Sequence, residues 1–269
     1  MIEEKIIENG TIKDNEIKKN IRLLLSKFIS LRRQGYVECI KKGSCGIGLT
    51  FESYLGKKAD SNSTPDYYGI EIKTRRAYSK SFVTLFGISP QGKSENEAKR
   101  LRDIYGYPSP TGVNLKCLYS EVTCNNFCKA GIKHYFKLKL DKQQQKLFLQ
   151  IYNKEKMLIE EDSYWDLATI KKRLYKKLKY LAYIKAWRKT ICKKEYFKYF
   201  DIKFYVLKNF DQFLQLLEQD RIKVIIALNS SHDKNNYGQL MAHKISFAID
   251  PNYLTSLFYI YEVKEDIIL

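Results

Sequence analysis

The chain has 269 residues, of which 44% are hydrophobic and 14% aromatic, so it can form a packed core and extensive disorder is excluded. It carries 48 Lys and Arg against 30 Asp and Glu, a formal net charge of +18, which favours polyanionic partners. Nucleic acid is the commonest such partner and an anionic membrane surface is the rival, although a Lys- and Ile-rich proteome would also produce a basic chain. The N-terminal residues resemble no signal peptide, and no apolar run approaches the roughly 20 residues that span a bilayer. We therefore expect a cytoplasmic protein that does not span a membrane.

The first part of the chain predicts two helices separated by a glycine-rich turn. Apolar residues recur at helical spacing over residues 16 to 34, and Gly35 is placed to end that helix. Residues 43 to 48 predict a flexible entry to a short helix over residues 50 to 55. A polar loop is expected to follow from residue 57 to residue 64.

The rest of the chain predicts strands mixed with helices. The expected elements are a strand at 70–74, its neighbouring strand at 82–86, a loop with one short helix over 87–112, a basic stretch with Tyr and Trp over 171–194, a helix at 211–220, a buried strand at 223–228, a polar loop at 229–239, a strand at 244–249, and a helix or strand near the C-terminus. This order of elements predicts an α/β or α+β core.

The residues that point to chemistry lie around the strand expected at 70–74. Alternate side chains of a strand share a face, so Glu71 and Lys73 should point one way while the isoleucines beside them enter the core. Asp66 lies across a tight turn through Gly69 and can bring its carboxylate beside that of Glu71. The spacing therefore places two carboxylates and one ammonium group together.

Two neighbouring carboxylates suit Mg²⁺, a hard ion that prefers oxygen ligands and keeps several waters. Such an ion lowers the pKa of bound water and neutralises charge on a phosphate, while Lys73 could orient the attacking water. The alternative is a solvated strand face, on which Glu and Lys two residues apart are common. Glu52 supplies a third carboxylate upstream, and its alternative is an ordinary helix-surface position.

Two segments resemble a known family. Residues 46–56 (GIGLTFESYLG) and 65–73 (PDYYGIEIK) are similar to the MvaI/BcnI restriction endonucleases, which are related to MutH within the PD-(D/E)XK nucleases. The likeness continues through residues 84–90 and 105–107, and resumes more weakly near 195–199 and along 213–228.

The resemblance implies a PD-(D/E)XK mixed sheet flanked by helices, with two lobes forming a DNA clamp. We place the catalytic lobe at residues 1–145 and the DNA-recognition lobe at 146–269. The resemblance also implies Mg²⁺ held by Asp66 and Glu71, with Lys73 assisting the water and Glu52 supporting the site. It implies a monomer that cuts double-stranded DNA at a short, nearly palindromic sequence. A cognate DNA methyltransferase is expected in the same system, without a stable complex.

Contacts with DNA should come from two kinds of residue. Lys and Arg neutralise phosphates, and the candidates are Arg75 and Arg76 after the catalytic strand and Lys171, Lys172, Arg173, Lys176, Lys177, Lys185, Arg188 and Lys189 in the basic stretch. Bases are read by polar side chains in the grooves, and the candidates are His232, Asp233, Lys234, Asn236, Tyr237, Gln239, His243 and Lys244. The alternatives are a solvated helix face for the first set and an ordinary polar hairpin loop for the second.

Three functions therefore follow from the sequence. The favoured one is a Mg²⁺-dependent type II restriction endonuclease. A MutH-like repair nickase shares its chemistry but leaves a single nick. A basic DNA-binding protein without catalysis would have lost acidic positions, whereas Glu52, Asp66, Glu71 and Lys73 are all present.

Overall fold

A computed structural model describes residues 10–43, 45–56, 64–110, 112–241 and 244–263. The chain forms two compact units, and it passes between them four times. The first unit comprises Met1–Ser81, Tyr175–Asn209 and Leu254–Leu269, and the second comprises Phe82–Leu174 and Phe210–Tyr253. None of these passages lies at residue 145, and the assignment of a catalytic and a recognition role to two lobes stays a prediction.

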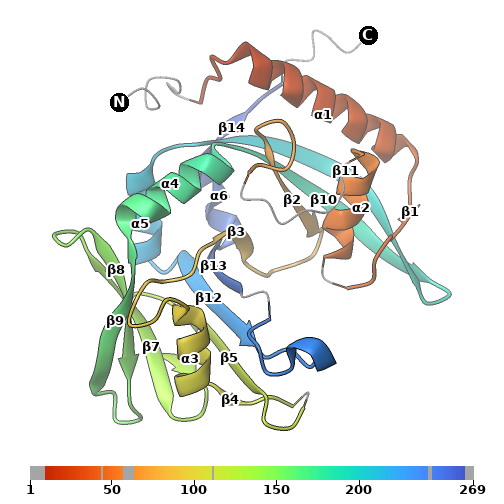
Figure 1. The fold of residues 1–269 in the computed structure, drawn as a ribbon. Coiled ribbons are helices and arrows are strands. Elements are labelled where there is room, and N and C mark those ends of the chain that lie inside the picture. Colours follow the sequence, from red (N-terminus) through yellow and green to blue (C-terminus); the bar gives the residue numbers. More distant parts are fainter. Residues whose placement is uncertain (1–9, 44, 57–63, 111, 242–243, 264–269) are drawn as a thin grey trace. The chain divides into compact units, whose positions relative to one another are not determined.

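The first unit is a mixed five-stranded sheet with helices packed on it (Figure 1). Its elements are α1 (Asn15–Arg33), β1 (Val37–Glu38), α2 (Gly46–Tyr54), β2 (Glu71–Arg76), β10 (Tyr180–Ile191), β11 (Lys194–Leu207), α6 (Leu254–Leu257) and β14 (Phe258–Tyr261). The strand order is β1-β11-β10-β2, with β14 pairing β11; β2 runs parallel to β10, and the other pairs are antiparallel. The prediction of a mixed sheet flanked by helices is confirmed.

Helix α1 forms as the sequence predicts. Asp14 caps it by accepting hydrogen bonds from the backbone N–H groups of Glu16 (2.9 Å) and Ile17 (3.2 Å). Gly35 follows its last turn with a φ of 76°, a conformation that glycine adopts without a steric penalty. The apolar stripe of α1 enters the core of the first unit and packs with residues of α2, β2, β10 and β11. The stripe consists of Ile17, Ile21, Leu24, Phe28 and Leu31.

Helix α2 begins four residues earlier than expected. The predicted flexible entry is wrong, because Gly46 and Gly48 lie inside the helix. A Cβ added to Gly46 would lie 2.4 Å from the carbonyl oxygen of Lys41 and 2.6 Å from Cys39 Sγ, so glycine here permits close packing. The loop expected at 57–64 lies outside the described residues except for Thr64.

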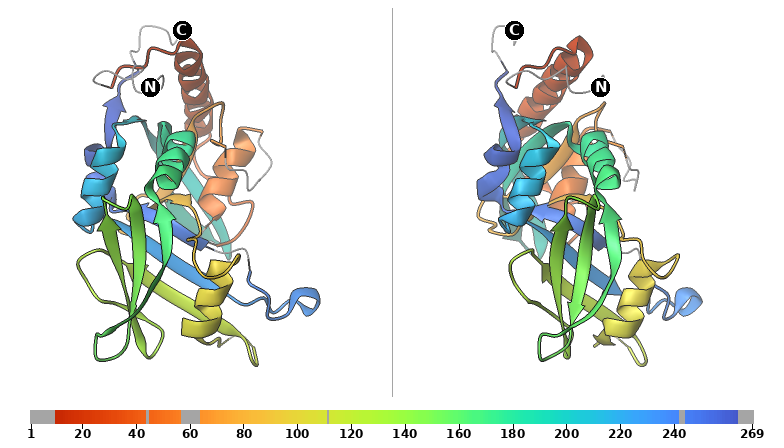
Figure 2. Two further views of the ribbon diagram at one scale, coloured as in Figure 1. Left: turned by 60° about the vertical axis from the view of Figure 1, so that its left-hand side comes forward. Right: turned by 90° about the vertical axis from the view of Figure 1, so that its left-hand side faces the viewer.

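The described residues of the second unit form two sheets. Its elements are β3 (Val83–Gly87), α3 (Glu97–Tyr105), β4 (Tyr107–Pro108), β5 (Lys116–Val122), β6 (Cys128–Ala130), β7 (His134–Asp141), β8 (Lys146–Tyr152), β9 (Leu158–Asp166), α5 (Phe210–Glu218), β12 (Ile222–Asn229), η2 (Lys234–Asn236), β13 (Lys244–Ile249) and η3 (Pro251–Tyr253). One sheet has the order β3-β13-β12-β5-β4 and the other is β6-β7-β8-β9 (Figure 2). Helix α4 (Leu167–Leu178) begins in this unit and ends in the first.

One predicted strand pairing is wrong. Strand β3 does not neighbour β2; it pairs with β13, with Phe86 opposite Phe247, while β2 pairs with β10, with Lys73 opposite Tyr183. Consecutive strands neighbour each other in only about two-thirds of cases. Here the chain leaves the first unit between the two strands, at Ser81.

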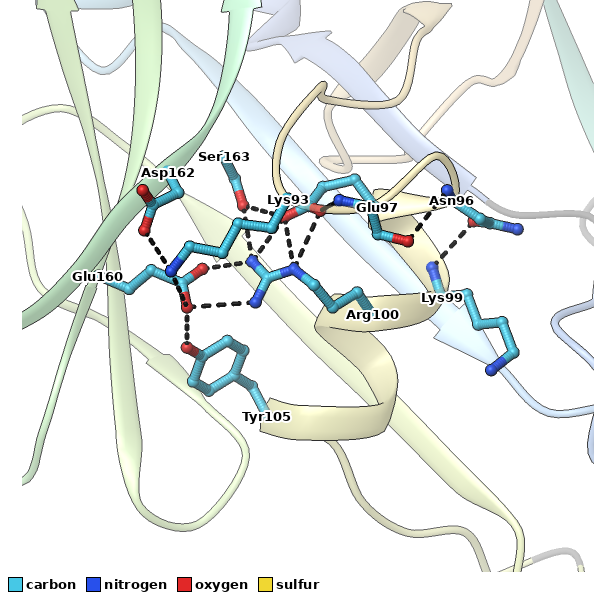
Figure 3. Close-up of polar contacts among 10 residues, drawn as sticks. Lys93, Asn96, Glu97, Lys99, Arg100, Tyr105, Glu160, Asp162 and Ser163 are labelled. Carbon is cyan, nitrogen blue, oxygen red and sulfur yellow. Dashed lines mark hydrogen bonds and ion pairs between the residues drawn. The ribbon is translucent and has the colours of Figure 1, made fainter.

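Helix α3 is fixed to β9 by a buried ionic cluster (Figure 3). Arg100 Nη2 lies 2.6 Å from Glu97 Oε1, and the guanidinium also binds Glu160. Ser163 donates to Glu97 and the Tyr105 hydroxyl donates to Glu160, each over 2.6 Å. Burial alone would raise the pKa values of Glu97 and Glu160, but hydrogen bonds from Arg100 and its neighbours hold both pKa values below their ordinary range. The cluster thus compensates its buried charges.

Candidate active site

The candidate site is built on a tight hairpin that leads into β2. Tyr67 and Ile70 pair across the turn, with backbone hydrogen bonds of 2.9 and 2.8 Å in the two directions. The two central residues, Tyr68 and Gly69, have φ values of 41° and 86°. Positive φ at both positions is what a type I′ hairpin turn requires, and glycine at the second makes it accessible. The turn brings Asp66 back beside the start of β2.

The structure brings the carboxylates of Asp66 and Glu71 together. Asp66 Oδ2 accepts a hydrogen bond from the backbone N–H of Ile72 over 3.1 Å. Burial raises the pKa of Glu71; the charge of Lys73 opposes this shift, and the nearby charge of Asp66 adds to it. Glu71 is 1% exposed, so the solvated strand face that was the alternative is wrong for this residue.

Two ammonium groups contact the two oxygens of Glu71. Lys73 Nζ lies 2.6 Å from Oε1 and donates a hydrogen bond to it. Lys177 Nζ, from the last turn of α4, lies 3.2 Å from Oε2. Ile70 and Ile72 enter the core, as the alternation predicts, while Glu71 and Lys73 project to the opposite face of the sheet.

Lys177 was predicted to contact phosphate, and its contact with Glu71 was not foreseen. The sequence did contain a signal for an inward position. Leu167, Ile170, Leu174 and Leu178 of α4 are buried, and residue 177 falls on the same helical stripe, seven residues after Ile170. A lysine within an apolar stripe indicates a partner for its charge.

Glu52 lies on α2, which packs against β2. A Cβ added to Gly48 would lie 3.3 Å from Thr74 Oγ1 and 3.6 Å from Glu52 Oε1, so this carboxylate lies towards the middle of β2. Among the residues that the structure describes, no group of three or more His, Cys, Asp and Glu side chains gathers as a metal site would. Glu52 therefore does not join Asp66 and Glu71 in one cluster here, and its supporting role stays a prediction.

The two arginines at the end of β2 divide into a buried and an accessible one. Arg75 is 9% exposed, and its guanidinium donates to the carbonyl oxygen of Ser79 and to the Tyr183 hydroxyl. Arg76 instead donates to the carbonyl oxygen of Gly43 over 3.2 Å and lines a cavity of about 640 Å³. Arg188 also lines this cavity, together with Tyr36, Ala77, Tyr78, Ser79 and Trp187. The structure therefore favours Arg76 and Arg188 over Arg75 for contact with a ligand.

The other predicted phosphate contacts lie on α4 and β10. Lys176 is exposed at the end of α4. Lys185 lies at a bulge of β10, 3.8 Å from Asp201 Oδ2, and Arg188 pairs with Glu195. Phosphate contact by these residues stays a prediction.

The predicted base-reading loop belongs to the second unit, between β12 and β13. Its backbone is ordered by hydrogen bonds between Ser231 and Gln239 and between Gly238 and Ser231, and Tyr237 donates to the carbonyl oxygen of Val113. The predicted contacts that it exposes to solvent are His232, Asp233, Lys234, Asn236, Tyr237 and Gln239. His243 lies outside the described residues, and Lys244 is the first residue of β13. Base reading by this loop stays a prediction.

Within the described part of the chain, no helix is long and apolar enough to cross a membrane.

Comparison with known proteins identifies the family. The structure of the restriction endonuclease MvaI in complex with its cognate DNA substrate matches with a TM-score of 0.84 and 29% identity, covering 90% of this chain and 98% of that chain. MvaI in the absence of DNA matches with a TM-score of 0.58 and 28% identity, covering 90% and 97%. A search of curated protein sequences finds no match. The family model of the MvaI/BcnI restriction endonucleases matches residues 25–258, so the chain belongs to the MvaI/BcnI restriction endonuclease family.

Proposed function

We propose that this chain is a type II restriction endonuclease that hydrolyses phosphodiester bonds of double-stranded DNA at a short, nearly palindromic sequence, in a Mg²⁺-dependent reaction. The observation that carries the proposal is the assembly of Asp66, Glu71 and Lys73 by the β2 hairpin, in a chain of a restriction endonuclease family. The likeness to MvaI in complex with its cognate DNA substrate supports DNA as the substrate.

The residues present fit a divalent cation. Glu71 Oε2 is a buried oxygen with no hydrogen-bond partner, and the Asp66 carboxylate lies close enough to raise the pKa of Glu71 by its charge. Crowded carboxylate oxygens of this kind are the ligands that Mg²⁺ prefers, and Asp66 and Glu71 would hold it. When bound, Mg²⁺ supplies an activated water and neutralises charge on the phosphate oxygens.

The protein's own groups then position the reactants. Lys73 is held 2.6 Å from Glu71 Oε1, where its ammonium can orient the attacking water or offset charge on the scissile phosphate. The backbone N–H of Ile72 holds Asp66 Oδ2, which fixes the second carboxylate relative to the first. Preorganised groups such as these lower the activation free energy without having to move during the reaction.

DNA would be held and read by the residues already placed. Arg76 and Arg188 contact phosphates from the first unit, with Lys176 and Lys185 as further contacts. The 229–239 loop, with His243 and Lys244 after it, reads bases from the second unit. From the family resemblance we also expect a cytoplasmic monomer, with a methyltransferase in the same system that forms no stable complex with it.

The test is digestion of unmethylated plasmid and phage DNA by the purified protein with Mg²⁺ or with EDTA. Glu71→Gln keeps the size of the side chain and removes its charge, and Glu16→Gln makes the same change at an exposed position of α1. Discrete bands that require Mg²⁺, persist in Glu16→Gln and vanish in Glu71→Gln are expected. Sequencing of the ends would then give the recognition site.

Two other results would contradict this proposal. Nicked circles without linear product would indicate the MutH-like strand-nicking activity. Intact DNA under every condition, together with tight binding in a gel-shift assay, would indicate a DNA-binding protein that does not catalyse hydrolysis.

A further inference from the structure

Lys177 is placed against the catalytic carboxylate rather than on the surface. Its side chain is 17% exposed, while that of Glu71 is 1% exposed. Besides Glu71 Oε2, its ammonium contacts the carbonyl oxygen of Thr64 over 3.4 Å. Its position on the buried stripe of α4 directs the lysine inward. A solvated residue at the end of a helix would point to solvent instead.

The contact between Lys177 and Glu71 is an ion pair without a well-directed hydrogen bond. Lys73 Nζ donates to Oε1 at 2.6 Å, whereas Oε2 has no hydrogen-bond partner although Lys177 Nζ lies 3.2 Å away. The two lysines thus hold the carboxylate unequally. The oxygen with the weaker contact is the one available to exchange its cation.

We propose that the ammonium of Lys177 takes the place of the divalent cation in the metal-free enzyme. It contacts Glu71 Oε2 there, and it must be displaced for the metal to bind. This inference rests on the proposed function, because it takes Glu71 to be a metal ligand. Lys177 would then lower the affinity of the site for metal, and its charge would compensate the buried carboxylate of Glu71 when no metal is bound.

The physical basis is competition between two cations for one oxygen. An unpaired buried carboxylate is costly, so a nearby ammonium stabilises the metal-free fold. The same ammonium repels an incoming divalent ion and already occupies its ligand. A lysine can leave readily, because its flexible stem moves the charge, and the Thr64 carbonyl offers an alternative acceptor.

The experiment measures metal binding in the absence of DNA, so that cleavage plays no part in the readout. Mn²⁺ is added stepwise to the full-length protein, and the concentration of unbound Mn²⁺ is measured at each step by electron paramagnetic resonance. Lys177→Met should bind Mn²⁺ about tenfold more tightly than the wild type, because a cation 3.2 Å from the ligand oxygen is removed. Lys177→Gln should act in the same direction, and Lys177→Arg, which keeps the charge, should stay near the wild type.

The matched control is Lys176→Met, which removes the same charge from the adjacent, exposed position and should change Mn²⁺ affinity little. Thermal unfolding without metal supplies a second readout: Lys177→Met should melt below the wild type, and added Mn²⁺ should narrow the difference. Unchanged or weaker Mn²⁺ binding in both neutral Lys177 variants would overturn the inference.

Glu71→Gln separates this inference from the proposed function. If Glu71→Gln weakens Mn²⁺ binding while the neutral Lys177 variants do not strengthen it, the metal site stands and the role of Lys177 is refuted. If Glu71→Gln leaves Mn²⁺ binding unchanged, Glu71 is not a metal ligand, and the metal site assigned under the proposed function fails together with the role of Lys177.

Discussion

Replacing Arg100 with methionine should strongly destabilise the second unit. Arg100 is the cation that joins the two buried carboxylates of Figure 3, since its side chain is 13% exposed while those of Glu97 and Glu160 are 1% and 9% exposed. Methionine keeps most of the apolar stem, so the variant removes charge and hydrogen bonds with little loss of packing.

The expected loss is about 3–5 kcal/mol in the free energy of unfolding, which is typical when one partner of a buried ion pair is removed. After the change, Glu97 keeps the Ser163 hydroxyl and the backbone N–H of Ser94. Glu160 keeps the Tyr105 hydroxyl and the half-exposed ammonium of Lys93, 4.0 Å from its Oε2. These remaining contacts compensate the two buried charges only in part. Adding Glu97→Gln and Glu160→Gln to Arg100→Met should recover much of the loss, because no buried charge then remains unpaired.

The assay is urea denaturation followed by the fluorescence of Trp165. The chain has 2 tryptophans, one in each unit, and Trp165 is fully buried with its indole N–H donating to the carbonyl oxygen of Ile88. In a Trp187→Phe background, the emission therefore reports on the second unit alone. The midpoint and slope of the transition give the free energy of unfolding.

Lys99→Met is the matched control on the same helix. Lys99 pairs with Asp103 over 2.7 Å, but the two side chains are 54% and 37% exposed. An exposed pair of this kind contributes about 0.3–0.5 kcal/mol. If Arg100→Met lowers the free energy of unfolding by less than about 1 kcal/mol, or by no more than Lys99→Met does, then Arg100 does not compensate the buried charges of Glu97 and Glu160.

Three further predictions concern other parts of the structure. Gly35→Ala should lower the free energy of unfolding by about 1–2 kcal/mol, because alanine is strained at this positive φ. Gly69→Ala should lower it further, because φ is positive there too and the added Cβ would lie 3.0 Å from an isoleucine methyl group of α1. Equal losses for the two variants in urea titrations would contradict the described turn. Burial raises the pKa values of Glu97 and Glu160, but hydrogen bonds, those from Arg100 above all, hold both below the ordinary glutamate value of 4.5. The two charged carboxylates should therefore stabilise the fold fully above that pH. This stabilisation should be lost as the pH falls through the folded-state pKa values. Urea titrations between about pH 6 and pH 3 would show this loss, which should be absent from Arg100→Met. Arg76→Met should weaken DNA binding and lower the slope of log affinity against log salt by about 1, and an unchanged slope in filter-binding assays would exclude a phosphate contact.

Local features of the fold and site could be predicted from the sequence. Apolar periodicity and the glycine after it give α1 and its end, and the alternation of Glu71 and Lys73 with isoleucines gives their common face. The turn at Tyr68 and Gly69, which returns Asp66 to Glu71, follows from residues a few positions apart. In each case the responsible interactions lie within a short stretch of chain.

Features that depend on distant segments could not be predicted. The pairing of β3 with β13 and the passages between two units depend on which strands meet after folding. The burial of Arg75 depends on Tyr183, more than a hundred residues later, and the contact of Lys177 with Glu71 joins segments equally far apart. A solvated strand face was the alternative for Glu71 and Lys73, and it fails for Glu71 because distant segments of the chain cover this side chain.

Two glutamates of this chain are equally buried and differ in how their charge is compensated. The side chains of Glu71 and Glu97 are each 1% exposed. Around Glu97, an arginine, a serine hydroxyl and a backbone N–H outweigh burial and lower its pKa, so its charge is compensated within the protein. Around Glu71, burial and the charge of Asp66 outweigh two lysines, its pKa is raised, and Oε2 lacks a hydrogen-bond partner. Evolution for stability alone would favour the first arrangement, because an incompletely compensated buried carboxylate lowers the stability of the fold. This difference supports the proposal that a divalent cation, shared with Asp66, completes the second arrangement.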